Sequence, residues 1–390
     1  MYFLGIDIAK TNHVASLIDI NGETIISTIK FTNDTNGYQK LLLAIKDYSN
    51  DKDNLYIAME ATGIYWLSLF SNLKEDEFNV SAFNPFQIKT FRSAVTNRKQ
   101  KTDSIDSVII AQYIRTFGAN ENVSLDEKYG SLKRLTRHRS DIINNVSATK
   151  TRLIGILDVV FPEYSSVFSD IFCKSSLAIL EKASSPKEIA KLQDRTLLSI
   201  ISTNSKGRLG IETVQKLKEL AKNSFGSKVL GKATTFEVKQ LLQQLVFFDS
   251  LLKELDEEID SYYNEFNCHL TSIPGIGKTL APIILAEIGD ISNFSKPNKL
   301  VAFAGSDPSV NQSGNKSSAN EKISKRGSPY LRHAIYTASF VAISNDETLR
   351  AYYDKKKSEG KHHYVALNAI SRKLLTIIWC VLSENRPYYN

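Results

Sequence analysis

Carboxylates at four positions in the first third of the sequence have the types and spacing of a divalent-cation site. They are Asp7 in "GIDIAK", Glu60 in "AMEATG", and Asp103 and Asp106 in "KTDSIDS". Oxygen-only ligands of this kind suit Mg²⁺ or Mn²⁺. Two such ions can clamp the attacking and leaving oxygens of a phosphodiester. Asp7 is the strongest argument for a metal site, because burying a carboxylate within an apolar strand costs much free energy unless a partner compensates its charge.

Each of these carboxylates also has an ordinary structural explanation. Asp103 could cap a helix, and Asp106 could be a favourable charge in its first turn. Glu60 could be a surface carboxylate at the end of a strand. The joint presence of all four, at positions that one fold can bring together, favours the metal-site interpretation.

Basic residues lie just upstream of the second acidic pair, in "FQIKTFRSAVTNRKQK". The stretch contains no acid and is interleaved with aromatic residues, so it could hold a nucleic-acid backbone beside the carboxylates. The alternative is a solvated basic loop. The predicted nucleic-acid contacts here are Lys89, Arg92, Arg98, Lys99 and Lys101.

A serine-rich stretch, "AGSDPSVNQSGNKSSANEKISKRGSPYLRHAIYTAS", is the most unusual part of the chain. One of its serines could attack a phosphodiester, with nearby cations stabilising the developing charge. The alternative is a flexible surface loop that touches DNA phosphates. Spacing alone does not select one serine among Ser306, Ser309, Ser313, Ser317 and Ser318. The predicted cationic contacts are Lys322, Lys325, Arg326 and Arg332.

The segment "IPGIGKT", residues 273–279, ends like an ATP-binding phosphate loop but lacks its first glycine, because Ser272 stands there. The preceding residues are also not the aliphatic strand that feeds such a loop. A helix-hairpin-helix is the better interpretation, since a helix N-terminus with free N–H groups binds phosphate well. Gly275, Gly277 and Lys278 are then predicted nucleic-acid contacts, and no ATP site is expected.

The elements that must position these residues begin with an α/β domain over residues 1–118. The apolar runs and helical spacings predict the order β-β-β-α-β-α-β-α, with a hairpin at Asn21-Gly22. This order is that of a ribonuclease H-like domain. An actin-like ATPase also begins with "GID", but no second phosphate loop follows at the expected place, so that interpretation is minor.

The remainder of the chain is predicted to be helical. Two long amphipathic runs, at about 132–160 and 236–266, indicate an antiparallel coiled-coil stalk or an ordinary helical bundle, with a helical insert at about 163–235. Residues 119–266 form this middle region, and residues 267–390 form a mainly helical domain that begins with the hairpin. The predicted fold class is therefore α/β plus all-α.

Charge and cysteine usage narrow the class of partner. The net charge is +7, and from Lys296 onward 15 Lys and Arg face 7 Asp and Glu, so the basic surplus lies at one end. Such a surplus indicates a polyanionic partner. Three widely spaced cysteines fit a reducing compartment, and no run is long enough to predict a membrane span. We expect a cytoplasmic protein that associates with the nucleoid when it acts.

The chain resembles the DEDD-type transposases of insertion sequences, the group that includes the pilin-gene invertase. The resemblance covers nearly the whole length, and the motifs that carry it are "GIDIAK", "MEATG", "NPFQIKTFRSA", "KTDSIDSVIIAQY", "SIPGIGKTLAPIILAEIGDISNF", "LVAFAGSDPSVNQSG" and "ISKRGSPYLRHAIY". It implies a RuvC-like N-terminal domain with the tetrad Asp7, Glu60, Asp103 and Asp106, and a C-terminal serine domain with Ser313 as the nucleophile. The family often has leucine after "AG", where this chain has Ser306.

The resemblance also implies partners and a reaction. It implies recombination of donor and target DNA through a phosphoserine link, guidance by a structured bridge RNA in some members, and a dimer or tetramer on DNA. The competing hypotheses are a RuvC-like hydrolytic nuclease or junction resolvase, and a non-catalytic nucleic-acid-binding protein whose carboxylates are structural. The first cleaves without a covalent intermediate, and the second binds without cleaving.

Overall fold

The computed structural model describes residues 1–49, 51–96, 102–119, 126–227, 229, 231–307, 312–313, 316–317, 323–325 and 327–389. The side chains of residues 232, 312, 313, 316 and 317 lie outside this description. The chain divides into two compact units, Met1–Leu125 and Asp126–Asn390. Each unit has its own apolar core, and each is described by itself.

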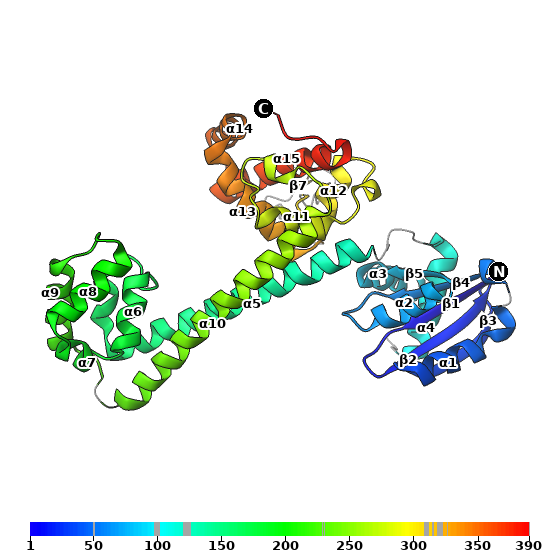
Figure 1. Ribbon diagram of the computed structural model, residues 1–390. Helices are drawn as coiled ribbons and strands as arrows, with labels where there is room; N and C mark the ends of the chain where they lie inside the picture. Colours follow the sequence, from blue (N-terminus) through cyan, green and yellow to red (C-terminus); the bar gives the residue numbers. More distant parts are fainter. Residues whose placement is uncertain are drawn as a thin grey trace. The chain divides into compact units, whose positions relative to one another are not determined.

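A mixed five-stranded sheet forms the centre of the first unit, with the strand order β3-β2-β1-β4-β5 (Figure 1). The first three strands form an antiparallel meander, and β4 and β5 run parallel to β1. The strands are β1 (Tyr2–Asp7), β2 (Asn12–Asp19), β3 (Thr24–Thr32), β4 (Leu55–Glu60) and β5 (Asn79–Phe83). The central strand β1 is nearly continuous in apolar residues because helices cover both of its faces.

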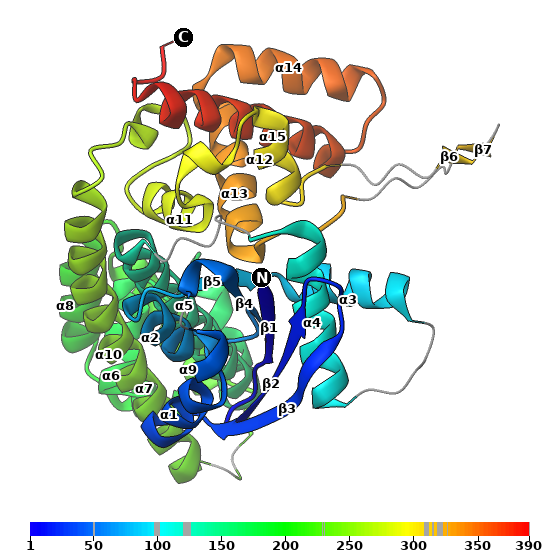
Figure 2. The ribbon, with the colours of Figure 1, turned by 90° about the vertical axis from the view of Figure 1, so that its right-hand side faces the viewer.

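Helices α1 (Thr35–Ala44) and α2 (Trp66–Glu75) pack on one face of the sheet, and α3 (Pro85–Val95) and α4 (Asp103–Phe117) pack on the other. Figure 2 shows the two pairs on opposite sides. The short 3-10 helices η1 (Lys46–Tyr48) and η2 (Lys52–Asn54) precede β4. Sequence analysis missed α3, although its start is readable. Asn84 and Gln87 form a capping box, and Pro85 occupies the first turn.

Helix α4 lies unusually close to β1 because Gly5 has no side chain. A Cβ at Gly5 would meet the carbonyl oxygen of Ser107 at 2.0 Å and the backbone nitrogen of Ala111 at 2.4 Å. The hydroxyls of Ser16 and Ser107 are 2.7 Å apart and buried, so a hydrogen bond joins β2 to the same turn of α4. These contacts fix both the height and the register of α4 over the sheet.

Two helices of 34 residues, α5 (Glu127–Val160) and α10 (Gly231–Asn264), run antiparallel in the second unit. Their direction follows from the ion pairs Lys128–Glu265 and Arg139–Asp256. A small helical bundle with its own core lies between them in the sequence and packs at one end of the pair (Figure 1). Its elements are η3 (Pro162–Ser166), α6 (Lys174–Lys182), α7 (Pro186–Lys191), α8 (Asp194–Ser205) and α9 (Ile211–Lys222).

The C-terminal helices share a large apolar core with the other end of this helix pair. The elements are η4 (Leu270–Ser272), α11 (Leu280–Ile288), η5 (Ile291–Asn293), α12 (Pro297–Phe303), β6 (Gln312–Ser313), β7 (Lys316–Ser317), α13 (Pro329–Asn345), α14 (Glu347–Ser358) and α15 (His363–Glu384). Within the described ranges, α15 alone is long and apolar enough to cross a membrane, but half of its apolar window is buried in this core. The α/β domain followed by a mainly helical remainder confirms the predicted fold class, whereas coiled-coil packing of α5 and α10 stays a prediction.

The close approach of α4 generates a test. Replacing Gly5 with alanine should lower the free energy of unfolding by about 2 kcal/mol or more, because the added methyl overlaps backbone atoms that cannot rotate away. Gly155→Ala is the matched control, since a Cβ at that position in α5 meets no atom within 4 Å. That control should be neutral or stabilising by roughly 0.5–1 kcal/mol. Urea unfolding of the full chain measures both, and equal effects would show that the contact is not tight.

Candidate active site

Asp7 and Glu60 end two neighbouring parallel strands. The register pairs Gly5 with Ala58 and Ile6 with Met59, so the next pair along is Asp7 beside Glu60. Adjacent strands lie about 4.8 Å apart, and side chains alternate between the two faces. Gly5 faces α4, and Asp7 therefore projects on the α4 face as well. Glu60 shares that face and accepts a 2.7 Å hydrogen bond from the Thr62 hydroxyl.

The first turn of α4 lies at the same end of β1. Ser107 sits over Gly5, and farther along the helix Arg115 donates to the carbonyl of Ile20, beyond the opposite end of the strand. Helix α4 therefore runs antiparallel to β1, and its N-terminal turn carries Asp103 and Asp106 toward the Asp7 end. Sequence reasoning alone could not establish this direction, because it depends on long-range packing.

The two carboxylates of that turn have different surroundings. Asp103 is exposed. The carboxylate of Asp106 is 13% exposed and is held by the guanidinium of Arg92 from α3. A predicted nucleic-acid contact therefore forms an ion pair with a predicted metal ligand. The Arg92 side chain is only 20% exposed, so little of its surface is available to a phosphate.

The donor chemistry at this end of the sheet fits a divalent cation. All four predicted ligands are carboxylates, and the two strand ends and the helix start converge on one side of the sheet. In the described part of the chain, no three acidic, histidine or cysteine side chains are close enough to hold a metal ion. One of the predicted ligands, Asp106, is instead engaged by Arg92.

Sequence reasoning did not single out His13, which stabilises the turn after Asp7. Its ring is 1% exposed, packs edge-on against Phe31, and accepts a hydrogen bond at Nδ1 from the backbone N–H of Ala9. Burial lowers the pKa of His13, and a hydrogen bond with the Asn33 side chain works against this. A neutral buried imidazole therefore positions the turn that leaves β1.

The basic stretch before α4 is described only in part. Lys89 lies exposed on α3, where it is available to a phosphate. The predicted contacts Arg98, Lys99 and Lys101 lie outside the described residues.

The segment 273–279 is a turn between η4 and α11 rather than a loop that follows a strand. Gly275 has φ +87° and packs against α13, where a Cβ would meet the carbonyl of Ala338 at 2.3 Å. The carbonyl of Gly277 accepts from the first turn of α11, and Lys278 is exposed. Lys278 also lines a cavity of about 130 Å³ together with Asp256 and Asp260. The complete helix-hairpin-helix stays a prediction, because only a three-residue 3-10 turn directly precedes the hairpin.

The serine-rich segment is closed at its base by backbone contacts. The backbone N–H of Lys325 donates to the carbonyl of Gly305, and Ser324 hydrogen-bonds to Asp307 through both backbone and hydroxyl. Arg332 donates to the carbonyls of Gly327 and Ala304, so it holds this base together. Its predicted role as a nucleic-acid contact competes with this structural one.

The predicted nucleophile is described only by its backbone. Ser313 pairs with Lys316 in the short antiparallel ladder of β6 and β7, which Figure 2 shows away from the helices of its unit. Ser306 is 4% exposed and Ser317 lies in β7. Ser309, Ser318, Lys322 and Arg326 lie outside the described residues.

A buried ion cluster anchors the helix that follows this segment. The carboxylate of Glu287 on α11 is 1% exposed and accepts two hydrogen bonds from Arg137 of α5, at 2.7 and 3.1 Å. Lys133 lies 3.7 Å away, and Ser328, the N-cap of α13, adds a hydrogen bond. The Arg137 guanidinium also stacks over Tyr330, 4.9 Å from the ring centroid.

Burial and these partners together shift the pKa values of Glu287 and Lys133. Burial alone would raise the pKa of Glu287, but the hydrogen bond from Arg137 and the charge of Lys133 outweigh burial and lower it. Burial lowers the pKa of Lys133, against the raising effect of Glu287. The cluster therefore joins α5, α11 and the start of α13 only while Glu287 is ionised.

Comparison with known proteins matches both units to transposases. The family model of the IS110-type DEDD transposases, described as "Transposase", matches residues 4–162. A second model, described as "Transposase IS116/IS110/IS902 family", matches residues 267–354. Neither match includes residues 163–266, which hold the helical bundle and α10.

Individual relatives span nearly the whole chain. The uncharacterized 44.8 kDa protein of insertion element IS116 from Streptomyces clavuligerus is 26% identical over 99% of this chain and 96% of its own length. The pilin gene-inverting protein of Moraxella bovis is 25% identical over 99% of this chain and 97% of its own. The transposase of IS1111A from Coxiella burnetii is 30% identical, over 38% of this chain and 42% of its own.

The buried cluster predicts a pH-dependent loss of stability. Glu287→Gln should lower the free energy of unfolding by about 2 kcal/mol at neutral pH, because it leaves two cations without their counter-ion. Since the pKa of Glu287 is lowered in the folded chain, its contribution is present above the ordinary glutamate pKa and is lost as pH falls through the lowered value. The difference between variant and wild type should therefore shrink in acid.

The control for this prediction is Glu265→Gln, which breaks the exposed pair with Lys128. Exposed pairs contribute little, so we expect less than about 0.5 kcal/mol. Urea unfolding at several pH values measures both variants. A Glu287→Gln effect as small as the control's would contradict the structural role of the cluster.

Proposed function

Because the chain belongs to the IS110/IS116 family of transposases, enzymes that cleave DNA and transfer its strands, we propose that it recombines DNA through a serine-linked intermediate assisted by the carboxylate site. The observation that carries the proposal is the convergence of Asp7, Glu60 and the first turn of α4 on one side of the sheet. The DEDD family uses divalent metal generally, and we propose Mg²⁺ or Mn²⁺ here.

The carboxylates would act as a rigid set of oxygen donors. Asp7 and Glu60 are held by the sheet, whereas Asp103 and Asp106 are held by α4. A divalent metal bound there would neutralise charge that builds up on the phosphodiester oxygens. For Asp106 to bind the metal, Arg92 would have to release its carboxylate.

We propose Ser313 as the nucleophile. Its hydroxyl oxygen would form a bond to phosphorus while the bond from phosphorus to one sugar oxygen breaks. The serine proton leaves to solvent or a nearby base, and the departing sugar oxygen takes up a proton. A hydroxyl of the second DNA then attacks the phosphoserine in the reverse sense and restores the serine. The support is the "QSG" context and its position in the ladder of β6 and β7.

The nucleic acids would be held by several surfaces. We propose that the exposed Lys278, which precedes the first turn of α11, contacts a backbone phosphate. Lys89 and the other basic residues before α4 would lie along DNA near the carboxylates. A structured bridge RNA and assembly of two or four protomers complete the proposal, with support from the family resemblance alone.

The alternative is a hydrolytic nuclease that uses the carboxylates and water. The observation that favours it is the same strand-end arrangement, which needs no serine. It predicts DNA cleavage without a protein-bound product.

A covalent adduct separates the two functions. Wild-type protein incubated with Mg²⁺, the flanking RNA of its element and labelled junction DNA should retain label after denaturation. Ser313→Ala should retain none, because no other group replaces the serine oxygen. Ser317→Ala, in the paired strand, is the matched control and should form the adduct normally. An adduct that survives in Ser313→Ala would place the nucleophile elsewhere.

The carboxylate role has its own test. Asp7→Asn should reduce metal-dependent strand cleavage by a factor on the order of 10³, since it removes a ligand charge at the centre of the site. DNA binding, measured by fluorescence anisotropy, should change little. Asp47→Asn, an exposed aspartate of the same unit, should cleave like wild type. Normal cleavage by Asp7→Asn would make this residue structural.

A further inference from the structure

The guanidinium of Arg92 contacts one of the four carboxylates of the candidate active site. Its Nη1 atom pairs with Oδ1 of Asp106. The two side chains are only 20% and 13% exposed, so solvent screens this pair less than it screens a surface ion pair. The basic composition of the sequence predicts that Arg92 contacts nucleic acid, whereas the structure places its charge on a predicted metal ligand.

Apolar packing holds the backbone of Arg92 in place beside α4. The ring of Phe91, the preceding residue of α3, packs edge-on against Tyr113 and Phe117 of α4, with centroids 5.3 and 5.7 Å apart. Ile88, one turn earlier in α3, is buried in the same apolar cluster as Tyr113. Arg92 can therefore leave Asp106 by rotation of its own side chain, while these contacts keep α3 against α4.

Carboxylates that converge on one side of a sheet repel one another, and positive charge nearby offsets this repulsion. Asp106 shares the first turn of α4 with Asp103, and this turn lies at the end of β1 at which Asp7 stands. Arg92 supplies a positive charge to this group through its contact with Asp106. The ion pair therefore helps to hold the acidic residues together in the absence of a metal.

The guanidinium of Arg92 and a divalent cation at Asp106 oppose each other electrostatically. If Arg92 kept its contact with Oδ1 while the other carboxylate oxygen bound the metal, two positive charges would lie close together and repel. If Arg92 instead released Asp106, the stabilisation that the ion pair provides would be lost. In both arrangements the charge of Arg92 lowers the affinity of the carboxylates for the metal.

We propose that Arg92 is a positioning residue that competes with the divalent metal for Asp106 and so sets the metal concentration at which the carboxylate site fills. A site weakened in this way fills more readily when phosphate oxygens of bound DNA contribute further metal ligands. The inference rests on the proposed function in taking the four carboxylates to bind a divalent cation. It goes beyond that function in assigning Arg92 to the control of the metal site.

The test measures Mn²⁺ binding to the full chain without nucleic acid, with electron paramagnetic resonance reporting the unbound ion. Arg92→Gln should bind Mn²⁺ more tightly than wild type by about fivefold or more, because it removes the opposing charge. Arg92→Lys keeps the charge, so its affinity should lie closer to that of wild type. An arginine with a purely structural role would not give tighter metal binding on removal.

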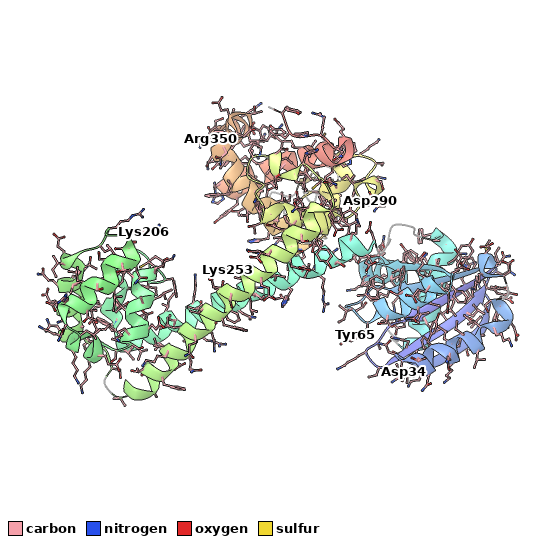
Figure 3. The ribbon with its side chains drawn as sticks, in the orientation of Figure 1. Asp34, Tyr65, Lys206, Lys253, Asp290 and Arg350 are labelled. Carbon is pink, nitrogen blue, oxygen red and sulfur yellow. The ribbon has the colours of Figure 1, made fainter. Side chains whose placement is uncertain are left out.

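Urea unfolding provides a second measurement. Without metal, Arg92→Gln should unfold at a lower urea concentration than wild type, and added Mn²⁺ should stabilise this variant more, because it binds the ion more tightly. The matched control is Arg350→Gln, at a residue that Figure 3 labels on α14. It also breaks an arginine–aspartate pair, but the side chains of Arg350 and Asp354 are 57% and 55% exposed. The control should match wild type in both measurements.

Asp7→Asn shows whether the measured ion binds at the carboxylates, and it should weaken Mn²⁺ binding by about tenfold or more. If it does so while Arg92→Gln binds Mn²⁺ like wild type or more weakly, the competition is overturned and the carboxylate site stands. If Asp7→Asn binds Mn²⁺ like wild type, both the role of Arg92 and the metal site of the proposed function are overturned. The adduct assay decides the serine chemistry separately.

Discussion

The contact between Gly5 and α4 is the constraint on which the carboxylate site depends. Carboxylates that must share a cation need positions fixed to a fraction of an ångström, and the sheet alone fixes only two of them. The missing side chain at Gly5 lets the backbone of α4 rest on β1, and the Ser16–Ser107 hydrogen bond sets how far the helix has slid along the strand. The first turn of α4 thereby reaches the end of β1 at which Asp7 stands.

In the second unit, charged groups rather than close backbone packing hold the ends of the serine-rich segment in place. A long segment that carries the proposed nucleophile needs firm ends, and a helix start supported only by its own cap would provide a weak one. Glu287 connects the cap of α13 to α5 through groups that are expensive to bury separately. Arg332 then closes the opposite side of the base through backbone carbonyls. Both arrangements fix the ends of the segment.

Periodicity and local sequence signals predicted the helices and strands, whereas long-range packing determines how the side chains of the candidate site are positioned. The strand and helix order of the first unit followed from apolar runs and turn residues, and the two long helices followed from their amphipathic spacing. Two features could not be predicted from local patterns, namely the direction of α4 relative to β1 and the ion pair between Arg92 and Asp106. Both depend on contacts between separate elements. Helix α3 was missed for a different reason. Its basic composition suggested a loop, although the capping residues of Asn84-Pro85-Phe86-Gln87 were readable.

The basic residues show why composition identifies a region but not a contact. A cation binds a phosphate only with the charge and hydrogen bonds that the fold has not already used. Arg332 donates its hydrogen bonds to backbone carbonyls, and Arg92 holds a carboxylate, whereas Lys278 is exposed. The net charge of a domain therefore predicts a polyanionic partner, and the pairing of each cation determines where that partner can bind.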